Sequence, residues 1–156
     1  TRRTKWNELL LFEKESADLL DATLDMDEEA VVESIEKIHV EYVSSIQYND
    51  ENSLSSVLSI AYLSTLRYYF KPIRELPAGR GFADFVFIPK PEYVEYYPAL
   101  LIELKWNKNA KTALQQIKER KYPSALLQYT GNILLVGINY NKKTKVHECK
   151  IEEFAK

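Results

Sequence analysis

Apolar residues in the first half of the chain recur at the spacing of amphipathic helices. The pattern predicts three helices, over residues 6–21, over residues 27–46, and from Asn49 or Asp50 to Phe70. The third helix carries a long apolar stripe that marks it as a core helix, made of Leu54, Val57, Leu58, Ala61, Tyr62 and Leu66. Lys71-Pro72 follows it, and proline disfavours the helical conformation in the residue before it.

The second half of the chain alternates between short apolar runs and turn signals, which is typical of strands. We predict strands over residues 73–76, 82–88, 99–105, 132–140 and 145–151. A helix over residues 110–121, broken near Pro123 and resumed through Gln128, separates the third strand from the fourth. The segment 89–98 holds three prolines and three tyrosines, which indicates a loop or a hairpin tip. The order of one helix, three strands, one helix and two strands predicts an α/β fold.

Three charged residues interrupt predicted strands that are otherwise apolar. Glu103 and Lys105 lie two positions apart in ALLIELKW, so their side chains point to the same side, about 7 Å apart along the strand. Asp84 stands alone among the apolar residues of FADFVFIP, in the preceding strand. If the two strands are antiparallel neighbours, Asp84 and Glu103 lie side by side.

Burying these charges costs several kcal/mol unless something compensates them, and function is a common reason to tolerate that cost. Two neighbouring carboxylates repel each other, and a divalent cation removes the repulsion. Carboxylate oxygens, a backbone carbonyl and water form the shell typical of Mg²⁺ or Mn²⁺. The alternative is a plain ion pair at a sheet edge, because an E-x-K triplet alone recurs by chance. The position of Asp84 on the preceding strand, after a long helix, raises the metal site to an equal alternative, and both interpretations stay open.

Composition places the chain among ordinary globular proteins, since 156 residues with 46% hydrophobic content suit one domain with a substantial core. The most apolar run, residues 133–138, is far shorter than the about 20 residues that cross a bilayer. The single cysteine, Cys149, excludes an internal disulfide, and no leader is recognisable, so we expect a cytoplasmic protein without membrane association. The chain begins at Thr1 with a TRRTKW segment that lacks a domain-like pattern, so we interpret it as part of a longer polypeptide.

Charge is unevenly distributed along the chain, although its net value is only −2. Residues 8–41 hold twelve acidic residues against two basic ones, a balance of −10. Residues 42–156 hold sixteen basic residues against eleven acidic ones, a balance of +5. The mildly basic second part is compatible with a polyanion partner, which binds a local patch and not the whole chain. We interpret the acidic residues of the second helix as a solvated face.

Several segments, taken in order, resemble the PD-(D/E)XK nuclease superfamily: ENSL, RELPAGRGFADFVFIP, PALLIELKW, QIKERKY and GNILLVGINYNKKTKVHEC. More narrowly, they are similar to the version found at the carboxyl end of bacterial proteins that begin with an AAA-ATPase-like domain. The resemblance covers about residues 51–152. It implies a restriction-endonuclease-like αβββαβ core, with a central mixed sheet flanked by helices. Residues 1–48 would then form a helical connector, and residues 49–156 the nuclease-like domain.

The resemblance also implies roles for individual residues. Asp84 and Glu103 would bind the metal, with the backbone carbonyl of Leu104 nearby. Lys105 would match the motif lysine, which positions the attacking water or helps to deprotonate it. Glu51, on the first core helix, would match the acidic residue that reaches the metal directly or through water.

Further residues would support this site. Gln116 would match the helix glutamine that lines it, and Arg80, in the turn Gly79-Arg80-Gly81, would face a phosphate. That turn lacks the spacing of a nucleotide-binding P-loop and precedes a strand. The chain departs from the motif at Ala83, where the strict pattern has proline before the aspartate.

A basic track along the following helix is a candidate surface for a phosphate backbone. It is formed by Lys105, Lys108, Lys111, Lys118, Arg120 and Lys121. The alternative is a solvated helix surface. Trp106 points away from Lys105 and is expected in the core. His39 and His147 have no partner motif, so we expect structural or exposed roles for them.

These observations lead to one principal hypothesis and two alternatives. The principal hypothesis is a Mg²⁺- or Mn²⁺-dependent nuclease that hydrolyses DNA, in preference to RNA, as the carboxyl-terminal part of an AAA-ATPase-like protein. The first alternative is a catalytically silent nucleic-acid-binding or regulatory module of that protein. The second is a structural domain that uses its helices for oligomerisation.

Overall fold

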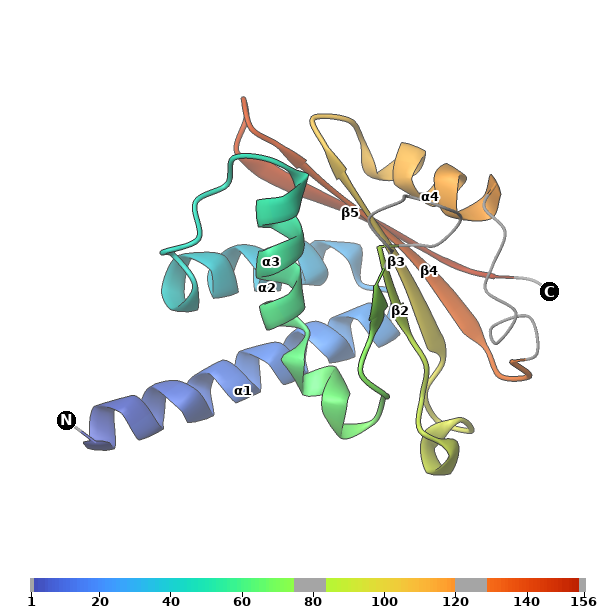
Figure 1. Ribbon diagram of the computed structural model, residues 1–156, viewed down its shortest axis with the longest axis horizontal. Coiled ribbons are helices and arrows are strands. Elements are labelled where there is room, and N and C mark those ends of the chain that lie inside the picture. The colour runs from blue at the N-terminus through green and yellow to red at the C-terminus, as the bar shows by residue number, and fades with distance from the viewer. Residues whose placement is uncertain (1, 75–83, 120–128, 155–156) are drawn as a thin grey trace.

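The computed structural model describes residues 2–74, 84–119 and 129–154 (Figure 1). Its helices are α1 (Arg2–Leu24), α2 (Glu28–Tyr42), α3 (Glu51–Ala61) and α4 (Ala110–Glu119), with the 3-10 helices η1 (Leu63–Arg67) and η2 (Pro91–Tyr93). Its strands are β1 (Ile73–Arg74), β2 (Phe85–Phe87), β3 (Ala99–Trp106), β4 (Ile133–Asn141) and β5 (Val146–Glu153). Among the residues described, no helix has the length and apolar character that crossing a membrane requires.

The strands form one mixed sheet in the order β1-β2-β3-β4-β5. The central pair, β3 and β4, is parallel and is joined by a crossover that contains α4, whereas the other neighbouring strands are antiparallel. Parallel neighbours require such a crossover, which explains the helical segment between two buried strands. The predicted α/β architecture, a mixed sheet flanked by helices with a helical region at the amino end, is confirmed.

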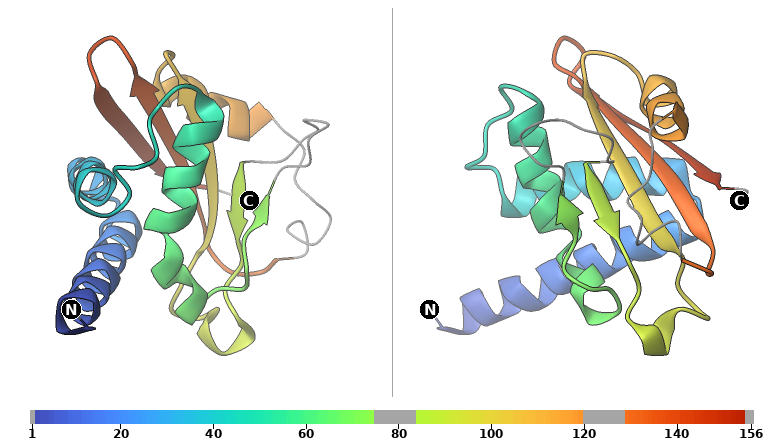
Figure 2. Two further views of the ribbon diagram at one scale, coloured as in Figure 1. Left: turned by 60° about the vertical axis from the view of Figure 1, so that its left-hand side comes forward. Right: turned by 45° about the vertical axis from the view of Figure 1, so that its right-hand side comes forward.

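Helices cover both faces of the sheet. Figure 2 shows α1, α2 and α3 on one side and α4 on the other. Successive side chains of β3 therefore enter two different cores. Leu100, Ile102 and Leu104 pack with the three amino-terminal helices, and Ala99 and Leu101 pack with α4.

Local hydrogen bonds explain where the first helices begin and end. Asp50 caps α3 by accepting the Ser53 N–H at 2.9 Å, as the predicted cap from Asn49 or Asp50 allows. The prediction that this helix runs to Phe70 is wrong, because the chain changes to the 3-10 helix η1 after Ala61. There the Ser64 N–H donates to Ser16 Oγ of α1, so it is not available to continue the α-helical ladder.

Other predicted boundaries differ by a few residues. α1 is longer than predicted, and α2 ends at Tyr42 because the Val43 N–H closes the helix on the Ile38 carbonyl. β2 is shorter than predicted. The predicted helical continuation through Gln128 lies outside the described residues.

Acidic residues of α2 bond to the edge strand β5. The Ile151 N–H donates to Glu28 at 2.7 Å, and the His147 N–H donates to Glu36 at 3.2 Å. The interpretation of these acidic residues as a solvated face is therefore wrong for Glu28 and Glu36. An edge strand leaves a row of N–H groups without strand partners, and these two carboxylates satisfy two of them.

Candidate functional site

Strand β3 brings Glu103 and Lys105 to the face of the sheet that α4 covers. Lys105 Nζ lies 3.8 Å from Glu103 Oε1, and the two side chains are 16% and 2% exposed. A carboxylate buried to this degree is costly unless a positive group lies near it. The neighbouring ammonium compensates that charge and remains partly accessible to solvent.

Asp84 directly precedes β2 and lies beside β3. The β2–β3 ladder pairs Phe85 with Ile102, so continuing its register by one residue places Asp84 opposite Glu103. The Leu104 N–H donates to Asp84 Oδ2 at 2.7 Å, which fixes the carboxylate against β3. The two strands are thus antiparallel neighbours, the arrangement on which the predicted site depends.

The backbone geometry of β3 directs the Leu104 carbonyl toward the side of the strand on which Asp84 lies. Within a strand, the N–H and the C=O of one residue project toward the same neighbouring strand. Since the Leu104 N–H meets Asp84, its carbonyl is directed to that side as well. Val86 belongs to the core under α4, and alternation puts Asp84 on that same face. We call Asp84, Glu103 and Lys105 the acid–lysine cluster.

Gly137 allows α4 to approach the sheet beside this cluster. It pairs with Glu103 in the parallel β3–β4 register. A Cβ atom at Gly137 would lie 2.6 Å from the Ala110 carbonyl oxygen and 3.0 Å from the Ala113 Cβ. The missing side chain therefore lets the first turn of α4 lie directly on β4, next to the buried carboxylate.

Two polar residues that the sequence analysis missed hold this region together. Asn139 is 3% exposed, pairs with Lys105 in the sheet, and accepts the Lys108 N–H at 3.0 Å. Glu148 of β5 accepts the Ala110 N–H, the first of α4, at 2.6 Å. The sequence does indicate Asn139, because it is the one polar residue of the apolar run ILLVGINY. The sequence does not indicate Glu148, because this residue follows the alternation of polar and apolar positions that any edge strand shows.

The structure relates the other predicted site residues to the acid–lysine cluster less directly. Glu51 is exposed at the start of α3, whose apolar residues pack on the opposite face of the sheet. Among the described residues, no three His, Cys, Asp or Glu side chains gather as a metal-binding group, so Glu51 does not join Asp84 and Glu103 here. Gln116 is half-buried on α4. Arg80 lies outside the described residues.

Arg120 and Lys121 of the predicted basic track lie outside the described residues, and the rest of the track divides into two parts. Lys108 and Lys111 are exposed at the start of α4, whereas Lys118, near its end, forms an ion pair with Glu152 of β5. Trp106 packs against the core of the amino-terminal helices, as predicted.

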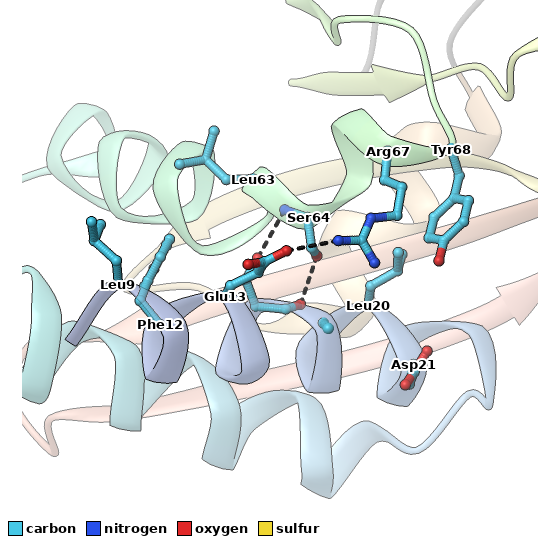
Figure 3. Close-up of a pocket in the computed structure, with 11 residues that line it drawn as sticks. Leu9, Phe12, Glu13, Leu20, Asp21, Leu63, Ser64, Arg67 and Tyr68 are labelled. Carbon is cyan, nitrogen blue, oxygen red and sulfur yellow. Dashed lines mark hydrogen bonds and ion pairs between the residues drawn. The ribbon is translucent and has the colours of Figure 1, made fainter. Parts of the chain in front are cut away.

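A separate pocket lies between α1 and η1 (Figure 3). Leu9 and Phe12 contribute apolar walls, and Arg67 pairs with Glu13 at 2.7 Å. Both elements belong to the helical layer that covers the opposite face of the sheet from α4 (Figure 2). The pocket therefore lies apart from the acid–lysine cluster.

The donor set of the cluster fits a divalent cation. Its candidate donors are the carboxylates of Asp84, beside β2, and Glu103 of β3, on one face of the sheet, with the Leu104 carbonyl oxygen directed to the same side. These are hard oxygen donors of the kind that Mg²⁺ and Mn²⁺ prefer. One ammonium among two carboxylates leaves a net negative charge, which favours a bound cation.

A mixed sheet with helices on both faces and a helical region at the amino end is consistent with a restriction-endonuclease-like α/β fold. In agreement with this fold, the family model of the PD-(D/E)XK nuclease superfamily matches residues 49–150, and the chain belongs to this superfamily. Its members typically use divalent metal ions. A comparison with curated proteins finds no match.

Proposed function

We propose that this chain is a divalent-metal-dependent nuclease that hydrolyses phosphodiester bonds of nucleic acid, DNA in preference to RNA. One observation carries the proposal: the acid–lysine cluster lies on one face of neighbouring strands in a member of the PD-(D/E)XK nuclease superfamily. Mg²⁺ or Mn²⁺ is the proposed cofactor, held by Asp84, Glu103 and the Leu104 carbonyl. A bound divalent ion supplies a hydroxide-like nucleophile and stabilises charge on the phosphoryl oxygens.

The chain's own residues prepare this chemistry. The Leu104 N–H holds the Asp84 carboxylate in one orientation, and burial does the same for Glu103. The Lys105 ammonium is a compact positive charge, placed to lower the proton affinity of an attacking water and to attract a phosphoryl oxygen. No covalent intermediate is needed, because the nucleophile is water.

We assign supporting roles to residues around the cluster. Glu51 would act through water, since α3 begins at the end of the sheet where β3 ends (Figure 1). Gln116 would line the site from α4, and Arg80 would face a substrate phosphate. Lys108, Lys111 and Lys118 would contact the nucleic-acid backbone.

We further propose that the chain works within a larger protein. The quoted sequence segments support a carboxyl-terminal position behind an AAA-ATPase-like domain, in a bacterial cytoplasmic protein. The amino-terminal helices would then connect the ATPase-like domain to the nuclease-like part.

The test is a cleavage assay on single- and double-stranded DNA and RNA with Mg²⁺, Mn²⁺ or EDTA. Asp84→Asn and Glu103→Gln should each lower metal-dependent cleavage by about a hundredfold or more, the scale expected when electrostatic stabilisation of a transition state is lost. Glu92→Gln, an exposed carboxylate on η2, is the matched control and should cleave like the wild type. Circular dichroism verifies the fold of each variant.

Two outcomes would redirect the proposal. Metal-dependent cleavage that persists in both site variants would refute the assignment of Asp84 and Glu103. Wild-type inactivity on every substrate, together with metal binding in calorimetry, would favour the catalytically silent regulatory module.

A further inference from the structure

Two lysine-rich loops lie at the carboxyl ends of the parallel strands β3 and β4. One leads from β3 into α4, and the other is the turn between β4 and β5. Together with the first turn of α4, they carry five exposed lysines: Lys108, Lys111, Lys142, Lys143 and Lys145. We call these five residues the lysine rim. Neither residues 104–111 nor residues 137–147 contain an acidic residue.

Hydrogen bonds tie the two loops together. The Lys142 N–H donates to Asn107 Oδ1 at 2.8 Å, and the Asn107 N–H donates to the Tyr140 carbonyl at 2.8 Å. The Lys108 N–H donates to Asn139 Oδ1 at 3.0 Å. Figures 1 and 2 show the two loops side by side in every view. The lysine rim is therefore one connected surface, although its residues are separated by about thirty positions in sequence.

Asparagine, and not lysine, builds the β4–β5 turn. Asn141 Oδ1 accepts the N–H groups of Lys143 and Thr144 at 2.9 and 3.1 Å, and the Lys145 N–H donates to the Asn141 carbonyl at 2.7 Å. The lysines contribute backbone groups to this turn, so their ammonium groups are available for another partner.

The charge of the rim is not compensated within the described part of the protein. No ion pair within 4 Å involves any of its five lysines there, whereas Lys118, farther along α4, pairs with Glu152. The nearest acid in the ladder, Glu148, accepts the Ala110 backbone N–H. A concentrated, uncompensated positive surface of this kind attracts polyanions.

Register gives the distance from the rim to the candidate site. Glu103 pairs with Gly137, and Lys142 follows five residues later, about 16 Å farther along the strand direction. Phosphates of one duplex strand repeat about every 3.4 Å along the helix axis. A backbone that is cleaved at the acid–lysine cluster and continues past the end of β4 would thus meet the rim roughly five phosphates away.

We propose that the β4–β5 turn is a second phosphate-binding element, which together with Lys108 and Lys111 holds the nucleic-acid backbone on the carboxyl side of the parallel strands. This inference rests on the proposed nuclease function and goes further by placing the substrate. The strand leaves the site across the β4–β5 turn.

The experiment measures binding separately from cleavage. Fluorescence anisotropy of a labelled duplex DNA oligonucleotide is titrated with the full chain in EDTA, over a series of salt concentrations. The test variant combines Lys142→Gln, Lys143→Gln and Lys145→Asn, with asparagine at position 145 because its φ of 59° suits that residue. Lys71→Gln is the control, because Lys71 is exposed between η1 and β1.

Each lost phosphate contact should reduce the slope of log K against log salt by about 0.9. We expect the triple variant to lower that slope by about 2 to 3 and to weaken binding about tenfold or more at low salt. The Lys71→Gln variant should bind like the wild type. Cleavage by the triple variant should show a raised KM.

The outcomes distinguish this inference from the function on which it rests. Binding and salt dependence of the triple variant equal to those of Lys71→Gln, in a wild type that binds and cleaves, would overturn the role of the turn and leave the nuclease standing. A wild type that neither binds nor cleaves any nucleic acid would overturn both.

Discussion

Glu103 and Lys105 stabilise each other's charge, because both side chains are largely removed from solvent. The carboxylate is almost fully buried, and the ammonium 3.8 Å away keeps some contact with solvent. Losing one partner leaves the other charge buried without it, which costs more than the pair contributes when intact. The same pairing keeps the lysine positioned for the proposed water activation. We therefore expect this one contact to affect both the stability of the protein and its proposed activity.

Replacing Lys105 separates these two roles. Lys105→Met should destabilise the protein by about 1–3 kcal/mol, because the Glu103 carboxylate loses its neighbouring ammonium. Lys105→Arg should keep most of the stability but lose most cleavage, because a planar guanidinium is broader than an ammonium and does not place a compact positive charge at the same point. Urea unfolding and metal-dependent cleavage rates measure the two effects. Wild-type cleavage by Lys105→Arg would show that charge alone suffices.

His147 makes stability depend on pH. Its ring is buried between Glu36, with Nδ1 at 3.2 Å from Oε1, and Tyr48, with Nε2 at 2.9 Å from the hydroxyl. Burial lowers the pKa of His147 below its usual 6.5, as does the nearby His39, while Glu36 opposes the shift. The unfolded chain then takes up a proton more readily than the folded one. Above pH 6.5, His147 is neutral in both states and does not reduce the free energy of unfolding. As pH falls from 6.5 toward the folded pKa, the unfolded state gains the proton first, so the free energy of unfolding decreases.

The corresponding variant is His147→Gln, which retains hydrogen-bonding groups but does not titrate. Between about pH 7 and pH 5, the urea midpoint of the wild type should fall more steeply than that of the variant. The difference between the two proteins removes the contribution of the carboxylates that they share. Parallel curves would show that His147 does not carry the pH dependence.

At the scale of elements, the contact between α4 and β4 positions the site. Gly137→Ala would bring a Cβ to within 2.6 Å of the Ala110 carbonyl, so the first turn of α4 has to move. We expect a loss of about 1–3 kcal/mol in the free energy of unfolding, together with reduced cleavage, because the helix packs beside Glu103. Gly131→Ala is the matched control, since the three atoms nearest to its new Cβ all belong to the Tyr129 side chain, whereas the nearest atom at Gly137 is a backbone oxygen. Equal effects at both glycines would contradict this explanation.

The sequence revealed those features that break a local pattern. Asp84, Glu103 and Lys105 interrupt apolar strands, and the order of the elements follows from periodicity alone. The early end of α3 was not predictable, because it depends on Ser16 of a distant helix meeting Ser64. Gly137 was missed for a similar reason: its importance appears only once α4 is known to cross back over β4. Non-local contacts, which no local pattern encodes, account for both.

At the scale of the whole molecule, the amino-terminal helices and the sheet share one hydrophobic core. Leu19 of α1 and Ile35 of α2 are fully buried in the same cluster as Ile102 of β3. Carboxylates of α2 also cover the edge of β5, through Glu28 and Glu36. Removing the helices would expose both apolar surface and unsatisfied strand N–H groups.

Such a shared core predicts one cooperative unfolding transition. In a Trp6→Phe variant, Trp106 is the sole tryptophan, and its ring lies 5.1 Å from that of Tyr140 beside the sheet. Its fluorescence then reports on the sheet, while far-UV circular dichroism is dominated by the helices. Because α1 and α2 bury their apolar residues against the same cluster as β3, neither part keeps its core when the other unfolds. The two signals should therefore share one urea midpoint. A helical signal lost at lower urea than the fluorescence change would show instead that the amino-terminal helices unfold as an independent unit.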